Sequence, residues 1–326
     1  MQSGFWKKLK KPFFVLAPMA DVTDAAFRRI IAKYGKPDVF WTEFVSADGL
    51  CSPGRKVLLR DLEFTPKEKP IVAQLFTSHP DKMRQAAALA AEMGFDGIDI
   101  NMGCPDRSIE KQGAGAAMIK NPKAARAVIR AAKEGIKDAG KDIPVSVKTR
   151  IGYTKNEIAT WIPELLAEDI AALTVHCRTR KEMSLVPARW EHVKEVTTIR
   201  DRMGVDTLII GNGDALDLED ARKKAAASGA DGVMLGRAIF GNPWLFSGLH
   251  GKQTVPSIEE KLRVMVEHTK LFEKLLGDIK NFSIMKKHYK AYVNGFDGAK
   301  ELRVRLMETD SADEVADIVD KYLKQG

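Results

Sequence analysis

The chain has 326 residues, of which 44% are hydrophobic and 29% are charged. This length suits one domain of about 250 residues with a small second domain. Lysine and arginine total 52 against 44 aspartate and glutamate, giving a formal net charge of +8, which favours a polyanionic partner without naming one. The three cysteines, Cys51, Cys104 and Cys177, form no C-x-x-C pair. The sequence therefore indicates neither a disulfide framework nor a thiolate zinc site, and we expect no metal.

The N-terminal segment imitates a short signal peptide, because four lysines at positions 7, 8, 10 and 11 precede the apolar run 13–17. Pro18 and Asp21 interrupt that run early, and no stretch approaches the roughly 20 apolar residues that a membrane span needs. We therefore predict that residues 13–17 form a first core strand in a cytoplasmic protein without a membrane partner.

Short apolar runs recur eight times, and most are continuous in hydrophobicity, as in parallel strands covered on both faces. The predicted strands are residues 13–17, 39–44, 71–76, 97–101, 145–149, 172–177, 208–212 and 232–236. Amphipathic helix patterns lie between most of them, for example at 24–34, 80–93 and 217–228, each closed by a glycine. The stretch 48–69 is the weakest unit. This alternation predicts an α/β fold, a (β/α)8 TIM barrel, over an open doubly wound sheet.

The strand pattern stops after Pro243, and only helical periodicity remains from Ser257 onward. Residues 257–260 and 311–314 are predicted capping boxes, while Gly277 and Gly295 lie where helices should end. We predict two domains, a catalytic barrel at 1–250 and a bundle of about four helices at 251–326.

Basic residues gather in one part of this helical region. Residues 280–305 contain seven lysines and arginines against two acidic residues, interleaved with Phe282, Tyr289, Tyr292 and Phe296. Such interleaving suits a phosphate backbone with exposed bases. The alternative is a solvated helix face over an aromatic core, and the segment alone favours this alternative over RNA binding.

The run Asn101-Met102-Gly103-Cys104-Pro105 follows the fourth predicted strand and puts a thiol where barrel enzymes keep their chemistry. Gly103 frees the backbone before the thiol, and Pro105 fixes φ after it. Cys104 can therefore act as an acid or as a nucleophile. The alternative is a small buried hydrophobe, as most free cysteines are.

Other chemistry-bearing residues recur at the same ends of the predicted strands. They are Pro18 and Met19 after the first, Gln74 on the third, Lys148 and Arg150 on the fifth, His176 and Arg178 on the sixth, Asn212, Gly213 and Asp214 after the seventh, and Gly236 and Arg237 after the eighth. Both final turns contain glycine and precede a helix whose free amides can hold a phosphate. Each residue has a structural explanation, but together they indicate a phosphorylated cofactor with an anionic or electron-rich ring system.

These motifs resemble those of the tRNA-dihydrouridine synthases, flavoenzymes that reduce uridine to dihydrouridine in transfer RNA. The resemblance runs from about residue 12 to 244 and also includes Gly113-Ala114-Gly115 and His176-Cys177-Arg178-Thr179. It implies reduction of the C5=C6 bond of uridine in tRNA, with FMN as cofactor and NADPH or NADH as reductant, in a protein that we expect to be a monomer.

The resemblance also implies residue roles. Pro18, Met19, Gln74, Lys148 and His176 would meet the flavin, and the two glycine turns, 212–214 and 236–237, would hold its phosphate. Cys104 would be the general acid that protonates C5 while hydride passes to C6, since a thiol near its usual pKa of about 8.5 is protonated at neutral pH. The substrate residues would be Asn101, which helps to position the base, Arg150, Arg178, Lys286, Lys287 and Lys290.

One segment, 180–190, departs from the family pattern, so its contacts to RNA or to the reductant are open. The runner-up function is another FMN barrel, similar to dihydroorotate dehydrogenase, that acts on a free pyrimidine or small enone, but it gives no reason for a basic helical region. A third interpretation is a non-catalytic RNA-binding barrel with a vestigial flavin site. Intact Cys104, Lys148 and His176 weigh against it.

Overall fold

The computed structural model describes residues 4–249 and 251–324. Eight parallel strands are hydrogen-bonded in the order β1-β8-β7-β6-β5-β4-β3-β2, and a bridge between Val15 and Val39 brings the first and second strands together. The strands are β1 (Phe13–Leu16), β2 (Phe40–Ser46), β3 (Ile71–Phe76), β4 (Gly97–Met102), β5 (Val145–Arg150), β6 (Ala172–His176), β7 (Leu208–Asn212) and β8 (Gly232–Leu235). The predicted barrel is confirmed.

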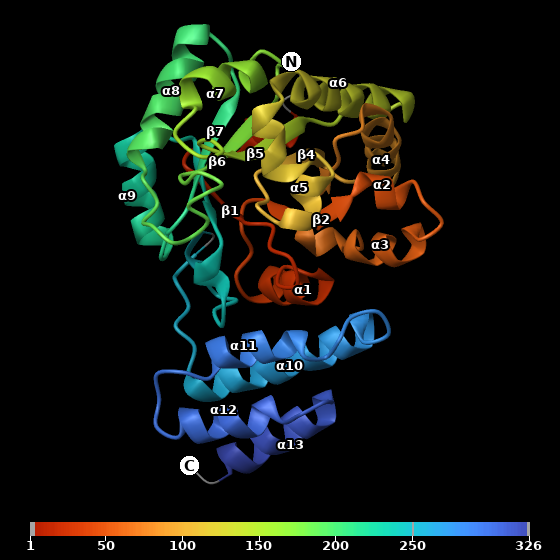
Figure 1. Ribbon diagram of the computed structural model, residues 1–326. Helices are drawn as coiled ribbons and strands as arrows, with labels where there is room; N and C mark the ends of the chain where they lie inside the picture. The colour runs from red at the N-terminus through yellow and green to blue at the C-terminus, as the bar shows by residue number, and fades with distance from the viewer. Residues whose placement is uncertain (1–3, 250, 325–326) are drawn as a thin grey trace.

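Helices follow the strands and cover the outside of the barrel (Figure 1). They are α1 (Ala25–Tyr34), α2 (Ala47–Leu50), α3 (Arg55–Asp61), α4 (Pro80–Glu92), α5 (Arg107–Lys111), α6 (Pro122–Asp138), α7 (Ile158–Leu166), α8 (Glu191–Met203) and α9 (Leu218–Ser228). Aspartate side chains cap α1 and α9: Asp24 accepts from the backbone N–H of Phe27, and Asp217 from that of Asp220. The weak unit, 48–69, holds only the short helices α2 and α3 and a 3-10 turn at Pro66–Glu68.

The barrel interior changes character along its axis. At the amino ends of the strands it is apolar, with Trp6, Phe13, Trp41 and Ile210 in one buried cluster. Halfway along the strands the interior becomes polar, since Gln74, Asp99 and Ser146 are register neighbours on β3, β4 and β5. Side chains two residues apart on a strand share a face. The inward positions therefore deliver polar groups to a single mouth.

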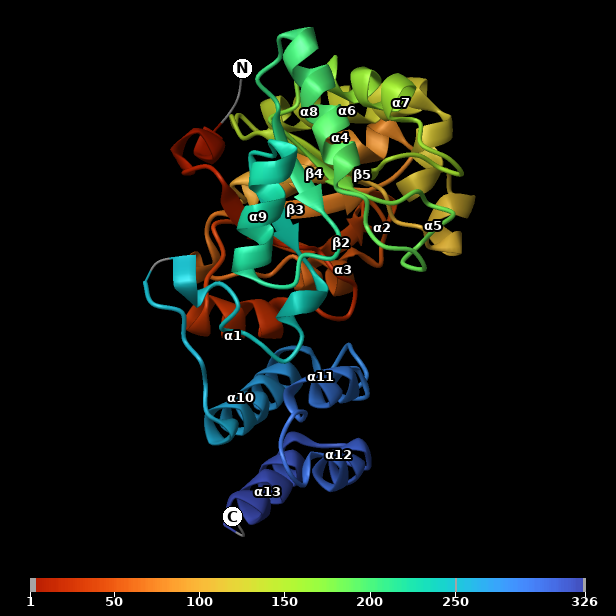
Figure 2. The ribbon, with the colours of Figure 1, turned by 90° about the vertical axis from the view of Figure 1, so that its left-hand side faces the viewer.

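Four further helices lie below α1 in Figures 1 and 2, and they are α10 (Ile258–Leu276), α11 (Ile284–Tyr292), α12 (Ala299–Met307) and α13 (Ala312–Leu323). Ser257 and Glu260 form the complete predicted capping box. Ser311 caps α13 as predicted, but the Glu314 carboxylate accepts from the backbone N–H of Asp310 instead. The predicted domain boundary falls at residue 250, which lies outside the described residues. No helix in the described part of the chain is long and apolar enough to cross a membrane.

Buried contacts join the helical region to the barrel, and we call this contact the joint. Phe27 of α1 packs against the rings of His268 and His288, with centroids 4.7 and 4.8 Å away. Lys280, between α10 and α11, reaches Glu43 of β2 at 2.7 Å and Asp61 of α3 at 3.1 Å. Lys280 also lies 3.8 Å from Asp21 in the loop after β1. The helical region is therefore fixed beside a loop that follows a strand at the mouth.

Candidate active site

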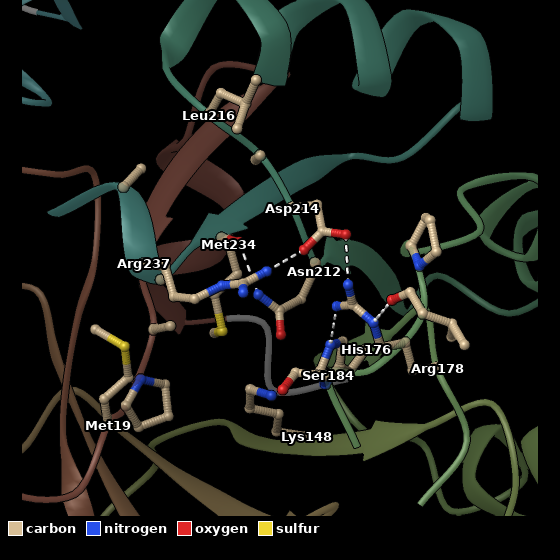
Figure 3. Close-up of a pocket in the computed structure, with 18 of the residues that line it drawn as sticks. Met19, Lys148, His176, Arg178, Ser184, Asn212, Asp214, Leu216, Met234 and Arg237 are labelled. Carbon is tan, nitrogen blue, oxygen red and sulfur yellow. Dashed lines mark hydrogen bonds and ion pairs between the residues drawn. The ribbon is translucent and has the colours of Figure 1, made fainter. Parts of the chain in front are cut away.

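A cavity of about 840 Å³ opens at the carboxyl ends of the strands (Figure 3), within the size range of cofactor sites. Every predicted cofactor-binding residue except Gln74 lines it: Pro18, Met19, Lys148, His176, Asn212, Gly213, Asp214, Gly236 and Arg237. Gln74 is fully buried and is bonded to Asp99 and Asn101. The predicted substrate residue Arg178 also lines the cavity.

Lys148 is the cation of the cavity whose charge is least compensated. Burial, followed by repulsion from Arg150, lowers the pKa of its ammonium group to about 8. No hydrogen bond or ion pair joins this group to any described residue. A cation in such a place is poised to stabilise negative charge on a bound ring or phosphate.

His176 is neutral in this site. Burial, with the positive charges of Arg150, Lys148, Arg178 and Arg237, lowers its pKa well below 6.5. The Arg178 guanidinium lies 3.1 Å from Nε2 of His176, and a guanidinium has only donors. Nε2 therefore accepts, and the ring carries its proton on Nδ1, where it can donate to a ligand.

Asp214 lies between two arginines. Figure 3 shows its carboxylate bonded to Arg178 on one side and Arg237 on the other, and it also accepts from the backbone N–H of Ala188 at 2.8 Å. These donors hold the pKa of Asp214 below its usual value against the effect of burial. The carboxylate therefore aims the two guanidinium groups, and only the Asp214 backbone is suited to face an anion.

The helix ends near the two glycine turns differ from the expectation of free amides. The first amides of α9 are capped from within, because Asp217 accepts from Asp220 and Asp220 accepts from the N–H of Leu216. After Gly236 only a three-residue 3-10 helix follows, Arg237–Ile239. A phosphate here would instead meet the turns themselves and the arginines beside them.

Gly213 shows why a residue without a side chain is needed in the first turn. Its φ is +127°, and a Cβ there would lie 2.8 Å from the Cβ of Ala188. Trp190 donates to the carbonyl of Gly213 at 2.8 Å. The divergent segment 180–190 is thus packed on this turn, and its residues Ser184 to Pro187 form one wall of the cavity.

Cys104 is half-buried, next to Phe44, Phe76, Ile109 and Ala114. Burial raises the pKa of its thiol above the usual value, so Sγ keeps its proton at neutral pH. Gly103 does not adopt a positive φ; it is needed because a Cβ would come within 3.2 Å of the Thr149 backbone. Gly115, with φ +59°, packs on the Cys104 carbonyl, where a Cβ would lie 2.8 Å away.

Two predicted substrate residues are tied into the protein. Arg150 is buried and donates to the carbonyls of Gly103 at 2.7 Å, Thr179 at 3.1 Å and Met183 at 3.2 Å. Arg178 is buried as well and also donates to the carbonyl of Val186 at 2.6 Å. Both guanidinium groups hold loops at the mouth together, which leaves them little freedom to follow RNA.

The three predicted substrate lysines of the helical region differ in whether an acidic side chain lies beside them. Lys286 lies 3.4 Å from Asp310, and Lys287 lies 3.9 Å from Asp21. Lys290 is exposed, with no ion pair to a described residue. Tyr289 and Tyr292 are fully buried. The aromatic residues of this segment therefore belong to a core under a solvated face, and the idea that they offer exposed stacking surfaces for bases is wrong for these two.

Sequence reasoning missed Asp99, a carboxylate without exposure in the middle of β4. Burial raises its pKa to about 6 despite hydrogen bonds from Ser146 and Gln74. The available signal was an acidic residue inside the apolar run Gly97-Ile98-Asp99-Ile100, since a charged residue is rarely buried without partners.

The fold and this cavity define a class, the (β/α)8-barrel enzymes that hold a phosphorylated cofactor at the carboxyl ends of their strands. Two solved structures share the fold: a 2-naphthoyl-CoA reductase complex (TM-score 0.55, 12% identity, 72% of this chain and 49% of that one) and a histamine dehydrogenase from Rhizobium sp. 4-9 (TM-score 0.53, 13% identity, 79% and 48%). The chain thus spans about half the length of each.

The pattern of the Dihydrouridine synthase (Dus) family matches residues 15–325. The chain is 41% identical over 324 residues to "Probable tRNA-dihydrouridine synthase 2" of Bacillus subtilis (strain 168), covering 99% of this chain and 97% of the relative. It is 40% identical over 328 residues to "Probable tRNA-dihydrouridine synthase" of Staphylococcus aureus (strain MRSA252), covering 100% and 97%. The chain belongs to the dihydrouridine synthase family, which makes it a flavin-dependent oxidoreductase and disfavours the free-pyrimidine alternative.

Proposed function

We propose that this protein reduces the C5=C6 bond of uridine in tRNA to 5,6-dihydrouridine, with FMN as cofactor, NADPH or NADH as reductant and Cys104 as the proton donor. The reaction class follows from family membership. The observation that carries the residue roles is a half-buried, protonated thiol at the same barrel mouth as a cavity rich in cations.

The residues of the cavity fit FMN. The Lys148 ammonium group has no hydrogen bond or ion pair with a described residue, Arg178 and Arg237 converge on Asp214, and Gly213 has no Cβ to collide with Ala188. Arg237 with the backbone of 212–214 and 236–237 would hold the phosphate, while Met19, Lys148 and the Nδ1–H of His176 would meet the ring. When bound and reduced, FMN supplies hydride.

The chain itself supplies the proton and the positioning. Cys104 keeps its proton on Sγ and would donate it to C5 of the uracil, because addition of hydride at C6 leaves electron density that must be protonated promptly. The side-chain oxygen of Asn101 is committed to the backbone of the Cys104 loop, and one of its amide N–H groups is donated to Gln74. Only the second amide N–H would therefore be available to the base. The target base must be unstacked to reach this mouth.

The division of labour follows the two parts of the chain. We propose a catalytic barrel at 1–250 and an RNA-binding helical domain at 251–326, in a cytoplasmic monomer. The helical domain is fixed next to the mouth through the joint, and Lys290 offers an uncommitted charge to phosphate. Arg150 and Arg178 would act on the substrate through the loops that they hold.

The test uses purified protein, FMN and an unmodified tRNA transcript, with NADPH and NADH in separate reactions. Nucleosides from the digested RNA are analysed by mass spectrometry, and free uridine serves as the competing substrate. We expect dihydrouridine at defined positions of the tRNA and none from free uridine. Reduction of free uridine with no product in tRNA would overturn the assignment of substrate.

A further inference from the structure

A continuous hydrogen-bonded chain runs from the buried carboxylate of Asp99 to the backbone of Cys104. Gln74 Nε2 donates to Asp99 Oδ2 at 2.7 Å, and Asn101 Nδ2 donates to Gln74 Oε1 at 3.0 Å. Asn101 Oδ1 then accepts from the backbone N–H groups of Gly103 at 3.0 Å and Cys104 at 2.9 Å. We call Asp99, Gln74 and Asn101 the relay.

The groups at the two ends of the relay fix the direction of donation in every hydrogen bond between them. An ionised carboxylate only accepts, and a backbone N–H only donates. The amides of Gln74 and Asn101 lie between them, so each must turn its NH2 group toward Asp99 and its oxygen toward Cys104. Asp99 and Gln74 are fully buried and Asn101 nearly so. No water can easily replace a missing partner, and an unmatched amide would be costly.

We propose that Asp99 is a positioning residue for the reaction: as the acceptor that ends the relay, it keeps Gln74 and Asn101 oriented so that Asn101 holds the Cys104 loop. The proposal rests on the proposed role of Cys104 as proton donor. Asp99 touches neither the substrate nor the thiol, and it acts only through the two amides.

Because of Ser146, an experiment can distinguish the role of Asp99 as a hydrogen-bond acceptor from a role of its negative charge. Ser146 Oγ donates to Asp99 Oδ1 at 2.6 Å, and it also lies 3.4 Å from the carbonyl of Ile98. In Asp99→Asn, the new amide can keep its oxygen toward Gln74 and donate its NH2 to Ser146 Oγ, which then donates to Ile98. The charge is lost, but the relay keeps its acceptor. Asp99→Leu loses both.

The direct readout is the alkylation rate of Cys104 by iodoacetamide, which needs neither flavin nor RNA. The parent for this experiment is Cys51→Ala, because Cys51 is the other partly exposed thiol, whereas Cys177 is fully buried and burial raises its pKa to about 12. The matched control is Thr42→Val. It removes a buried hydrogen bond of 3.0 Å to the backbone N–H of Gln74 and leaves the relay intact.

We expect Asp99→Leu to alkylate about tenfold faster than the parent, since a released loop exposes a half-buried thiol. Asp99→Asn and Thr42→Val should stay within about twofold of the parent. In tRNA reduction, Asp99→Leu should lower kcat by about tenfold or more with little change in KM for tRNA. If Asp99→Leu does not fold, Gln74→Met breaks the relay at its next member and should accelerate alkylation similarly.

Folded Asp99→Leu or Gln74→Met with the alkylation rate of the parent would overturn the proposal. A rate for Asp99→Asn as high as that of Asp99→Leu would also overturn it, because charge and not an acceptor would then be what matters. Since alkylation is measured without substrate, these outcomes stand apart from any failure of the tRNA reaction itself.

Discussion

The barrel mouth and the joint each hold a partly buried lysine, and the two lysines are treated in opposite ways. In the mouth, Lys148 makes no hydrogen bond or ion pair within residues 4–249 and 251–324, and burial lowers its pKa to about 8. In the joint, Lys280 contacts Glu43 and Asp61, and these carboxylates raise its pKa against the effect of burial. The joint satisfies its charge within the chain. The mouth leaves a charge for a ligand to satisfy, which is how a binding site differs from a structural contact.

The largest expected effect belongs to the mouth. Cys104→Ala should keep bound FMN and its reduction by NADPH but lose turnover on tRNA by about 100-fold to 10,000-fold, because only the proton donor is removed. Flavin absorbance, donor oxidation and dihydrouridine formation measure the three steps separately. Cys51→Ala is the control and should be fully active. A Cys104→Ala protein that is unfolded, with a fully active Cys104→Ser, would make the thiol a packing residue.

Substitutions in the joint should lower the stability of the protein and leave its activity largely unchanged. Lys280→Met removes the cation beside Glu43, whose side chain is 6% exposed. Burial already raises the pKa of Glu43 to about 7, so this carboxyl can take up a proton, and we expect a loss of at most about 3–5 kcal/mol in the free energy of unfolding. Lys33→Met is the matched variant, because the pair Lys33–Glu267 also crosses the joint but lies exposed and should matter by about 1 kcal/mol or less. Urea unfolding followed by circular dichroism measures both. Equal losses would show that burial does not separate the two pairs.

Replacing Lys148 in the mouth should change the free energy of unfolding in the opposite direction. The pKa of Lys148 is lower in the folded than in the unfolded protein, so its charge destabilises the fold below about pH 10. At pH 7 and without FMN, Lys148→Met should therefore raise the free energy of unfolding, by up to about 3 kcal/mol. The same variant should bind FMN about tenfold or more weakly. A destabilised Lys148→Met protein would mean that a partner within the chain compensates this charge.

The two buried histidines of the joint should make the stability of the fold sensitive to acid. His268 and His288 are fully buried, and neither ring nitrogen of either has a hydrogen-bond partner among the described residues. Burial lowers the pKa of His288 to about 3, so the unfolded chain takes up the proton first, and stability falls as the pH drops from about 6.5 toward 3. At pH 5 this amounts to about 2 kcal/mol for His288.

The variant His288→Leu should remove the part of this loss that His288 contributes, while His268, whose pKa burial also lowers well below 6.5, keeps its own part. Thermal unfolding between pH 7 and pH 4 measures the difference from the parent. His192, which is only partly buried beside Glu195, supplies the control His192→Leu. Parallel pH profiles for His288→Leu and the parent would contradict the assignment.

The smallest effect concerns RNA contacts of the helical region. Lys290→Gln should weaken tRNA binding modestly and reduce the slope of log affinity against log salt by about 0.9 or less, the value for one lost phosphate contact. Lys286→Gln should change the slope less, since Lys286 already faces Asp310. Flavin content should be unchanged in both. An unaltered slope for Lys290→Gln would leave this lysine on a solvated face.

The positions of the strands and of the site residues could be predicted, because both follow from the local pattern of apolar residues along the sequence. Apolar runs give the parallel strands, and the ends of such strands must meet at one mouth. The hydrogen-bond and ion-pair partners of the site residues could not be predicted, because they depend on which loops meet in the folded chain. Arg150 faces the carbonyl of Thr179, 29 residues away, and Asp214 lies between two arginines of different loops. The burial of Tyr289 likewise depends on how α11 packs, which a basic segment does not reveal.

The most direct test of the contrast between mouth and joint is proton uptake when FMN binds to the apoprotein. Calorimetric titrations at pH 8 in buffers of different ionisation enthalpy give the number of protons exchanged. Because Lys148 has a pKa of about 8, an anionic ligand beside it should draw in about half a proton. We predict that this uptake disappears in Lys148→Met and persists in Lys33→Met. Uptake that is absent in the parent, or unchanged in Lys148→Met, would contradict the account.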